Sequence, residues 1–205
     1  INQIVNTETE LHLFFPTPVW STQIKKHDST NNKIYNYIKN LQKNDSEGLK
    51  KSNTKGWHSK NFILADEPVI AFINLLSPAI NKTLTDMNWD LKNQETKITS
   101  MWSIINKKEA SNARHIHGNN FISAAYYVKA PNNCGKIVFY DPRSAPVFNS
   151  PDNKGANNLN SNAHSIEPKE GLLVLFPSYL HHSVENNMSE DERIVVSFNI
   201  NLLAN

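Results

Sequence analysis

Two hydrophobic patterns divide the chain into a helical first half and a strand-rich second half. In residues 29–43, and again from Glu67 to Trp89, apolar side chains recur at intervals of three and four, the spacing of one helix face. From Thr96 onward, apolar residues alternate with polar ones or form short runs separated by Gly, Pro and Asn. This order predicts an α+β fold in which helices support an antiparallel sandwich or barrel.

Capping residues and prolines set the expected helix ends. Ser29 and Thr30 are candidates to cap the first helix, and Pro68 suits the first turn of the second. Pro78 is expected to kink or split the second helix, because proline has no amide hydrogen to donate. No cluster of chemical groups stands on either helix, so both are expected to be structural support.

The strands of the second half are short and bounded by turn residues. The clearest are expected at Lys97–Asn106, Phe121–Val128, Gly135–Tyr140, Leu172–Phe176, His182–Glu185 and Arg193–Leu202. Residues 144–162 form a long polar loop, and loops of this length in compact domains are usually functional or disordered, so a lid is the hypothesis for this loop. The polar stretch 44–60 is expected to be a loop in which Trp57 and His58 pack on the surface.

Length, charge and cysteine content narrow the classes of function. With 205 residues, one domain over 1–205 is expected, with 1–95 as an N-terminal segment with supporting helices and 96–205 as the core. The formal net charge of +2 argues against nucleic acid or an anionic membrane as a partner, and no apolar run is long enough for a transmembrane helix. The single cysteine, Cys134, excludes an internal disulfide and a thiolate zinc site, and it favours a reducing compartment, so a cytoplasmic location is expected.

Histidines provide the strongest candidate for a site. His115 and His117 stand two residues apart in a segment expected to be extended, where alternate side chains point to the same face. A second pair, His181 and His182, follows later in the chain. Two histidines on one face, with a third brought in by a distant strand, fit a metal site with three protein ligands and open positions opposite.

Two further residues bear on this site. Arg193 begins the last strand and shares a face with Ser197 and Asn199, so it could hold a carboxylate through a fork of hydrogen bonds. This suggests an anionic co-substrate beside the metal. Asp141 lies in the turn before Pro142 and is an alternative metal ligand to His117, although an aspartate before proline also commonly starts a turn.

Taken in order, these motifs resemble the Fe(II)/2-oxoglutarate-dependent dioxygenases, especially uncharacterised bacterial and phage oxygenases related to prolyl 4-hydroxylases. The resemblance covers Phe14–Trp20 and then residues 98–202, over half of the chain. The motifs that carry it are His115-Ile116-His117, Ser123-Ala124-Ala125-Tyr126-Tyr127-Val128, Gly135-Lys136-Ile137-Val138-Phe139, Gly171-Leu172-Leu173-Val174-Leu175-Phe176-Pro177, His182 and Arg193. The family usually has His-x-acid where this chain has His117, which leaves open whether His117 or Asp141 completes the metal shell.

The resemblance implies a double-stranded β-helix (a jelly-roll, cupin-like core) with supporting N-terminal helices and a metal in one mouth. It implies that Fe(II) is held by His115, His117 and His182, with His182 chosen over His181 by its spacing from the Phe-Pro motif. The residues implied to bind the co-substrate 2-oxoglutarate are Arg193, Tyr127 and Asn106, and Ser197 is expected to join them because it shares the strand face of Arg193. Arg193 and Tyr127 would hold its distal carboxylate, and Asn106 would lie near its metal-bound end.

The implied activity is that of an enzyme, an oxygenase that hydroxylates a C–H bond of a peptide residue or small metabolite and releases succinate and CO2. An alternative is a cupin-like metal-binding jelly-roll protein without 2-oxoglutarate-dependent activity. A third is a structural jelly-roll in which the histidines are incidental. Dependence on 2-oxoglutarate separates them, because only the oxygenase needs a carboxylate-binding pair. The edges of such a core often dimerise, so a homodimer is also open.

Overall fold

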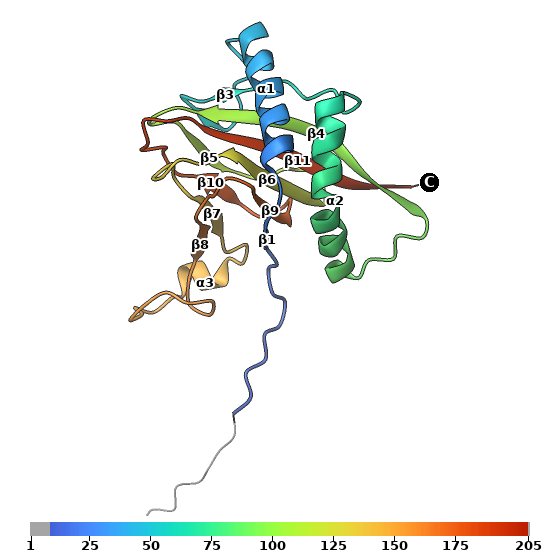
Figure 1. Cartoon of the computed structure of the whole chain (residues 1–205). Coiled ribbons are helices and arrows are strands. Elements are labelled where there is room, and N and C mark those ends of the chain that lie inside the picture. The colour runs from blue at the N-terminus through green and yellow to red at the C-terminus, as the bar shows by residue number, and fades with distance from the viewer. Residues whose placement is uncertain (1–8, 205) are drawn as a thin grey trace, which may run out of the picture.

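In the computed structural model, which describes residues 9–204, two long helices lie on one side of two β-sheets (Figure 1). Residues 1–8 and 205 of the expected 1–205 domain lie outside the described residues. The helices are α1 (Asp28–Asn44), α2 (Glu67–Met87) and the short α3 (Ala145–Phe148). The fold is α+β, as expected. Most strands follow the two long helices, but one short strand precedes α1 and two more lie between α1 and α2, which the expected order of helices and then strands did not include.

The strands form two antiparallel sheets. The larger has the order β1-β9-β6-β11-β4-β3 and the smaller has the order β2-β5-β10-β7-β8. The larger sheet contains β1 (Trp20–Gln23), β3 (Trp57–His58), β4 (Gln94–Asn106), β6 (Ile122–Lys129), β9 (Leu172–Pro177) and β11 (Arg193–Ala204). The smaller sheet contains β2 (Asn53–Thr54), β5 (Ser111–His115), β7 (Ile137–Tyr140), β8 (Ala163–Ile166) and β10 (His182–Val184).

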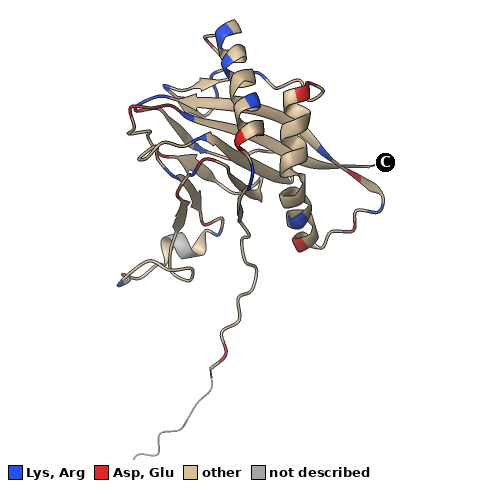
Figure 2. Ribbon diagram, in the orientation of Figure 1, with Lys and Arg blue, Asp and Glu red and all other residues tan. Residues whose placement is uncertain are grey.

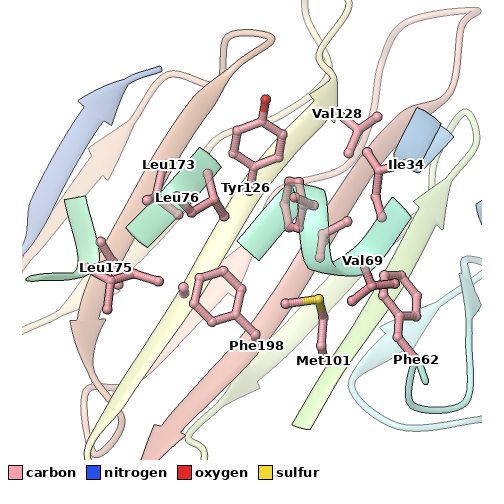
Figure 3. Packing of buried hydrophobic residues seen from close by; sticks show 14 of the residues in the cluster. Ile34, Phe62, Val69, Leu76, Met101, Tyr126, Val128, Leu173, Leu175 and Phe198 are labelled. Atoms are coloured by element: carbon pink, nitrogen blue, oxygen red, sulfur yellow. The ribbon is translucent and has the colours of Figure 1, made fainter. Parts of the chain in front are cut away.

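The two faces of the larger sheet pack against different parts of the molecule. Along β6, Tyr126 belongs to the cluster that packs against the helices (Figure 3). Its ring meets Phe72 of α2 edge-on with the centroids 4.9 Å apart. Its neighbours Ala125 and Tyr127 belong instead to a second cluster, which includes Phe139 of the smaller sheet. Because side chains alternate along a strand, one sheet separates a helix-packed core from the interior of the jelly-roll.

The structure tests two expectations about the helix ends and Pro78, which was expected either to kink or to split the second helix. α1 begins at Asp28 with His27 at its N-cap, and no side chain caps it, so Ser29 and Thr30 lie inside the helix. α2 runs through Pro78 as one element and does not split there. Its buried residues on both sides of the proline pack on the larger sheet, and this burial outweighs the one missing hydrogen bond.

Short strands account for most of what the sequence patterns missed. The stretch 44–60 contains β2 and β3, and both Trp57 and His58 are buried instead of packing on the surface. The reason is tertiary: β3 pairs with the long strand β4, with Trp57 opposite Ile105 and His58 opposite Ile104. Two-residue strands have too little sequence to show a period of two.

Charged residues of both signs are interspersed over the helices and loops (Figure 2). This agrees with the small formal net charge of +2. Among the described residues, no helix combines the length and the apolar character that a bilayer crossing requires.

Candidate active site

A cavity of about 840 Å³ lies inside the jelly-roll. Strands β4, β6, β9 and β11 of the larger sheet line it, together with β5 and β10 of the smaller one. Residues between Leu49 and Asn61 supply a further wall. The described residues of 144–162 do not line it, so the loop expected to be a lid is not part of this cavity.

Three histidines meet in this cavity. One ligand nitrogen from each of His115, His117 and His182 can be chosen so that all three lie within 4.8 Å of one another. The ring centroids of His115 and His182 are 4.3 Å apart, and each lies 5.1 Å from the centroid of His117. His181, the alternative to His182, is exposed, as expected for the neighbouring position of a strand.

Backbone carbonyls fix the orientation of two of these rings. The Nδ1 of His115 lies 2.7 Å from the carbonyl oxygen of Ala113, and the Nδ1 of His182 lies 2.9 Å from that of Leu180. A carbonyl oxygen can only accept, so Nδ1 carries the hydrogen in both rings and Nε2 keeps its lone pair. Each ring is thereby set to present Nε2 as a metal ligand.

His117 lies two residues beyond the end of β5 and is positioned differently. Its backbone N–H donates to the carbonyl oxygen of Ser178 at 3.0 Å, which ties this segment to the turn after β9. Its ring lies 5.5 Å from the Trp102 ring, centroid to centroid. The strand ends at His115, although residues 115–117 were expected to be extended throughout, and His115 and His117 still lie on the same side, in the cavity.

Burial keeps the three imidazoles neutral. Loss of hydration lowers the pKa of His182 to about 3 and that of His117 to about 4, and it also lowers the pKa of His115. The neighbouring histidines add to the lowering for His117 and His182, because two positive rings would repel each other at this distance. Neutral imidazole is the form that binds a metal ion.

Asp141 is engaged elsewhere. Its Oδ1 accepts from the backbone N–H and the Nε of Arg143, and its Oδ2 accepts from Nη2 of Arg143 at 2.9 Å. This contact lowers the pKa of the Asp141 carboxyl. Among the described residues, Asp141 does not join the three histidines in a common ligand cluster. The geometry therefore favours His117 over Asp141 as the third ligand.

Arg193 is almost fully buried at the start of β11, with 1% of its surface exposed. Its Nη1 donates to the carbonyl oxygens of Cys134, Gly135 and Glu185, the last two at 3.1 and 3.2 Å. Its Nη2 is buried without a hydrogen-bond partner among the described residues, although Arg193 lines the cavity. Burial lowers its pKa, but a guanidinium in a protein stays charged, so this site holds a cation whose Nη2 amino group has no acceptor in the described part of the chain.

The other residues expected to bind the co-substrate also line the cavity, but they differ in how free their polar groups are. Tyr127 lines the cavity, and burial raises the pKa of its hydroxyl, which therefore remains a donor. Asn106 is the cross-strand partner of Arg193, but its Nδ2 already donates to Asn112 at 3.0 Å. Ser197 also lines the cavity, on the Arg193 face of β11.

Two cavity residues escaped the sequence reasoning. His58 and Trp102 stack in parallel with their ring centroids 5.7 Å apart and an interplanar angle of 8°. The Nε1 of Trp102 is buried without a hydrogen-bond partner in the described part of the chain. Trp102 lies on the expected strand at Lys97–Asn106 and could have been found from its alternation with Asn106, whereas no local pattern marks His58.

Residues 100–199 match the protein family described as "Putative 2OG-Fe(II) oxygenase". The matched range contains all three clustered histidines and Arg193. No curated protein sequence matches the chain. The chain belongs to the 2-oxoglutarate- and Fe(II)-dependent oxygenases, a class of enzymes that uses Fe(II) and 2-oxoglutarate.

Solved structures of this class share the fold. A viral collagen prolyl hydroxylase from Paramecium Bursaria Chlorella virus-1 superposes with a TM-score of 0.60 at 14% identity, covering 91% of this chain and 96% of that one. A prolyl hydroxylase from Trichoplax adhaerens, in complex with a peptide fragment of hypoxia inducible factor, gives 0.61 at 17% identity, covering 89% and 82%. HygX from Streptomyces hygroscopicus, with nickel, 2-oxoglutarate and hygromycin B bound, gives 0.58 at 12% identity, covering 90% and 83%. The expected double-stranded β-helix core is thus confirmed.

Proposed function

We propose that this oxygenase hydroxylates a C–H bond of a peptide residue or small metabolite, using Fe(II) held by His115, His117 and His182. The observation that carries the proposal is that the histidine cluster and the buried Arg193 line one cavity. When bound, Fe(II) and 2-oxoglutarate supply the oxidation, in which one oxygen atom of O2 enters the substrate and the other enters succinate as CO2 is released.

The histidine cluster fits a divalent iron ion. Fe(II) accepts imidazole nitrogens readily, and three protein ligands leave positions for a co-substrate. Two of the rings are already fixed with Nε2 as the free nitrogen, and burial keeps all three neutral. Because none of the ligands is an anion, the ion keeps its full charge and attracts an anionic chelator more strongly.

Arg193 fits the distal carboxylate of 2-oxoglutarate. Its unpaired Nη2 and its buried charge call for an anionic acceptor, since a buried donor without a partner is costly. Tyr127 adds a hydroxyl donor from the neighbouring strand β6, where it lies opposite Val195, two residues after Arg193. We propose smaller roles for Ser197, as part of the same wall, and for Asn106, as a positioning residue whose amide is held by Asn112.

The substrate class, the partner and the compartment are parts of this proposal. Among the solved structures of similar fold, some are prolyl hydroxylases and one holds hygromycin B, which supports a peptide or a small molecule as substrate. An enzyme that takes 2-oxoglutarate as co-substrate suits the cytoplasm, as does the single cysteine Cys134. The edges of the sheets offer a surface for a homodimer.

The test is a calorimetric titration of 2-oxoglutarate into anaerobic, Fe(II)-loaded protein. We expect micromolar binding by the wild type, and loss of binding in both His182→Ala and Arg193→Ala. Iron content measured on the same samples should fall in His182→Ala alone. Iron binding by the wild type without any 2-oxoglutarate binding would overturn the oxygenase proposal and favour a cupin-like metal-binding protein.

A further inference from the structure

One wall of the cavity comes from outside the range that matches the family. Residues between Leu49 and Asn61 contribute Lys51, His58 and Lys60, whereas the match covers 100–199. His58 stacks on Trp102 with the ring centroids 5.7 Å apart, and the Trp102 ring lies 5.5 Å from the ring of His117. The wall therefore stands beside the proposed metal site, where a substrate would be held.

The charged residues that line the cavity carry positive charge. The chain has 19 acidic and 21 basic residues, yet no aspartate or glutamate is found among the described residues that line the cavity. The cationic residues in the lining are Lys51, Lys60, Arg114 and Arg193. Arg114 stacks on the Tyr140 ring at 4.2 Å and precedes His115 on β5, so its charge is directed away from the cluster.

The two wall lysines retain charge that is available to a ligand. Lys60 lies 3.5 Å from the Asp45 carboxylate, but its side chain is 75% exposed, and such surface pairs are weak. Lys51 forms no ion pair within the part of the chain that the structure describes. Lys55, which lies between them, is different because it pairs with Glu109 at 2.8 Å and does not line the cavity.

Trp102 supplies a second, independent indication. Its side chain is 92% buried, since 8% remains exposed, and its Nε1–H has no acceptor among the described residues. An indole N–H can only donate a hydrogen bond. Trp102, which stacks on His58, therefore carries a buried donor for which the described part of the chain offers no acceptor. Trp102 lies opposite Ser197, which is four positions along β11 from Arg193. At about 3.3 Å per residue, Trp102 and Arg193 are therefore separated by roughly 13 Å along the strand direction.

We propose that the substrate carries an anionic group, a carboxylate or a phosphate, that binds on the wall formed by Lys51, Lys60 and Trp102. The reacting carbon then lies over the histidine cluster, while Arg193 holds the co-substrate at the other end of the cavity. This inference rests on the proposed function, because it takes the Arg193 position to be filled by 2-oxoglutarate. It assigns the wall to substrate recognition, with attraction between opposite charges as the physical basis.

The test uses small probes with anaerobic protein saturated with Fe(II) and 2-oxoglutarate, so that the Arg193 position is occupied. Inorganic phosphate and N-acetylglycine are the anionic probes, and N-acetylglycinamide is the neutral match of the second. Binding is followed by NMR line broadening of each probe. We expect one or both anions to bind and the neutral amide not to bind, and the tighter anion distinguishes a phosphate from a carboxylate.

Variants then locate the binding. Lys51→Ala/Lys60→Ala should weaken the anionic probe about tenfold or more, and Lys55→Ala, the matched control on the same segment, should leave it unchanged. Trp102→Phe should also weaken it without changing the affinity for 2-oxoglutarate. Equal binding of the anionic and neutral probes, or equal loss in the Lys55 control, would overturn the inference. A protein that binds 2-oxoglutarate but no anionic probe refutes this inference alone, whereas failure to bind 2-oxoglutarate refutes the proposed function.

Discussion

His115 and His182 are cross-strand neighbours on β5 and β10, and each donates its Nδ1 hydrogen to the carbonyl oxygen two residues earlier in the chain. The same local contact thus sets the same tautomer twice, in strands that are distant in sequence. The consequence is a pair of Nε2 lone pairs held ready in the cavity before any metal arrives, which lowers the cost of ordering the ligands.

Metal binding should therefore stabilise the native protein. A metal that binds only the folded state adds about 2.7 kcal/mol to the free energy of unfolding at a free concentration of one hundred times its Kd. We expect Mn(II), used as an air-stable substitute, to raise the melting temperature of the wild type and not that of His182→Gln. An equal rise in both proteins would mean that the metal binds elsewhere.

Exchange of one neutral ligand for a carboxylate should tighten metal binding. Glutamate reaches nearly as far as imidazole, and in His117→Glu its negative charge would attract the ion, so we expect the Kd for Mn(II) to fall about tenfold. His117→Ala should weaken binding instead. If both substitutions leave the Kd unchanged, His117 is not a ligand and Asp141 becomes the candidate again.

Arg193 should be irreplaceable by lysine. Lysine keeps the positive charge but lacks the planar fork, so Arg193→Lys is expected to raise the Kd for 2-oxoglutarate about 10- to 100-fold, or ~1.4–2.7 kcal/mol. Arg143→Lys, which alters the arginine paired with Asp141, is the control and should bind normally. Thermal melting of both variants separates loss of binding from loss of folding, and normal binding by Arg193→Lys would contradict the assignment.

The metal-free protein should lose stability as the pH falls below about 6.5. His117 and His182 have pKa values of about 4 and 3 in the folded protein and ordinary values near 6.5 when unfolded. Between these values the unfolded chain binds more protons, so the free energy of unfolding decreases by up to about 1.4 kcal/mol per pH unit for each histidine. Urea denaturation at pH 7 and pH 5, with EDTA present, measures this slope. His182→Gln should reduce the slope, and an unchanged slope would show that other groups cause it.

Gly135 should not tolerate a side chain. Its φ is +83°, and a Cβ there would lie 2.6 Å from the carbonyl oxygen of Glu185 and 2.9 Å from Nη1 of Arg193. Gly135→Ala is expected to destabilise the protein by about 1–3 kcal/mol and to weaken 2-oxoglutarate binding through Arg193. Gly155→Ala, at a position with no neighbouring atom within 4 Å, is the control and should have little effect on either quantity.

The sequence was most informative where a residue's own strand fixes its direction. Alternation along β11 placed Arg193 and Ser197 on one face, and the structure has both in the cavity. The family resemblance selected His182, and alternation then placed its neighbour His181 on the opposite face, where the structure has it exposed. Such predictions succeed because a strand's period of two is local and needs no knowledge of what the strand packs against.

The sequence was least informative where a side chain is placed by contacts between distant segments. His58 was expected on the surface, because nothing near it indicates that β3 pairs with β4. The contact of Asp141 with Arg143 was also not expected, so the sequence left open whether Asp141 or His117 is the third metal ligand. Both outcomes depend on tertiary contacts whose sequence signal is too weak to read.

The alternation along β11 has a consequence for how this enzyme can change over time. Residues that pack against the helices, such as Val196 and Phe198, are interleaved one by one with residues that line the cavity, such as Val195 and Ser197. Substitution at every second position can therefore reshape the cavity while leaving the helix-packed core intact. An insertion of a single residue that is not taken up by a β-bulge would move the residues on one side of it to the opposite face of the sheet. We therefore expect β11 to tolerate point substitutions that adapt the cavity to new substrates more readily than changes of its length.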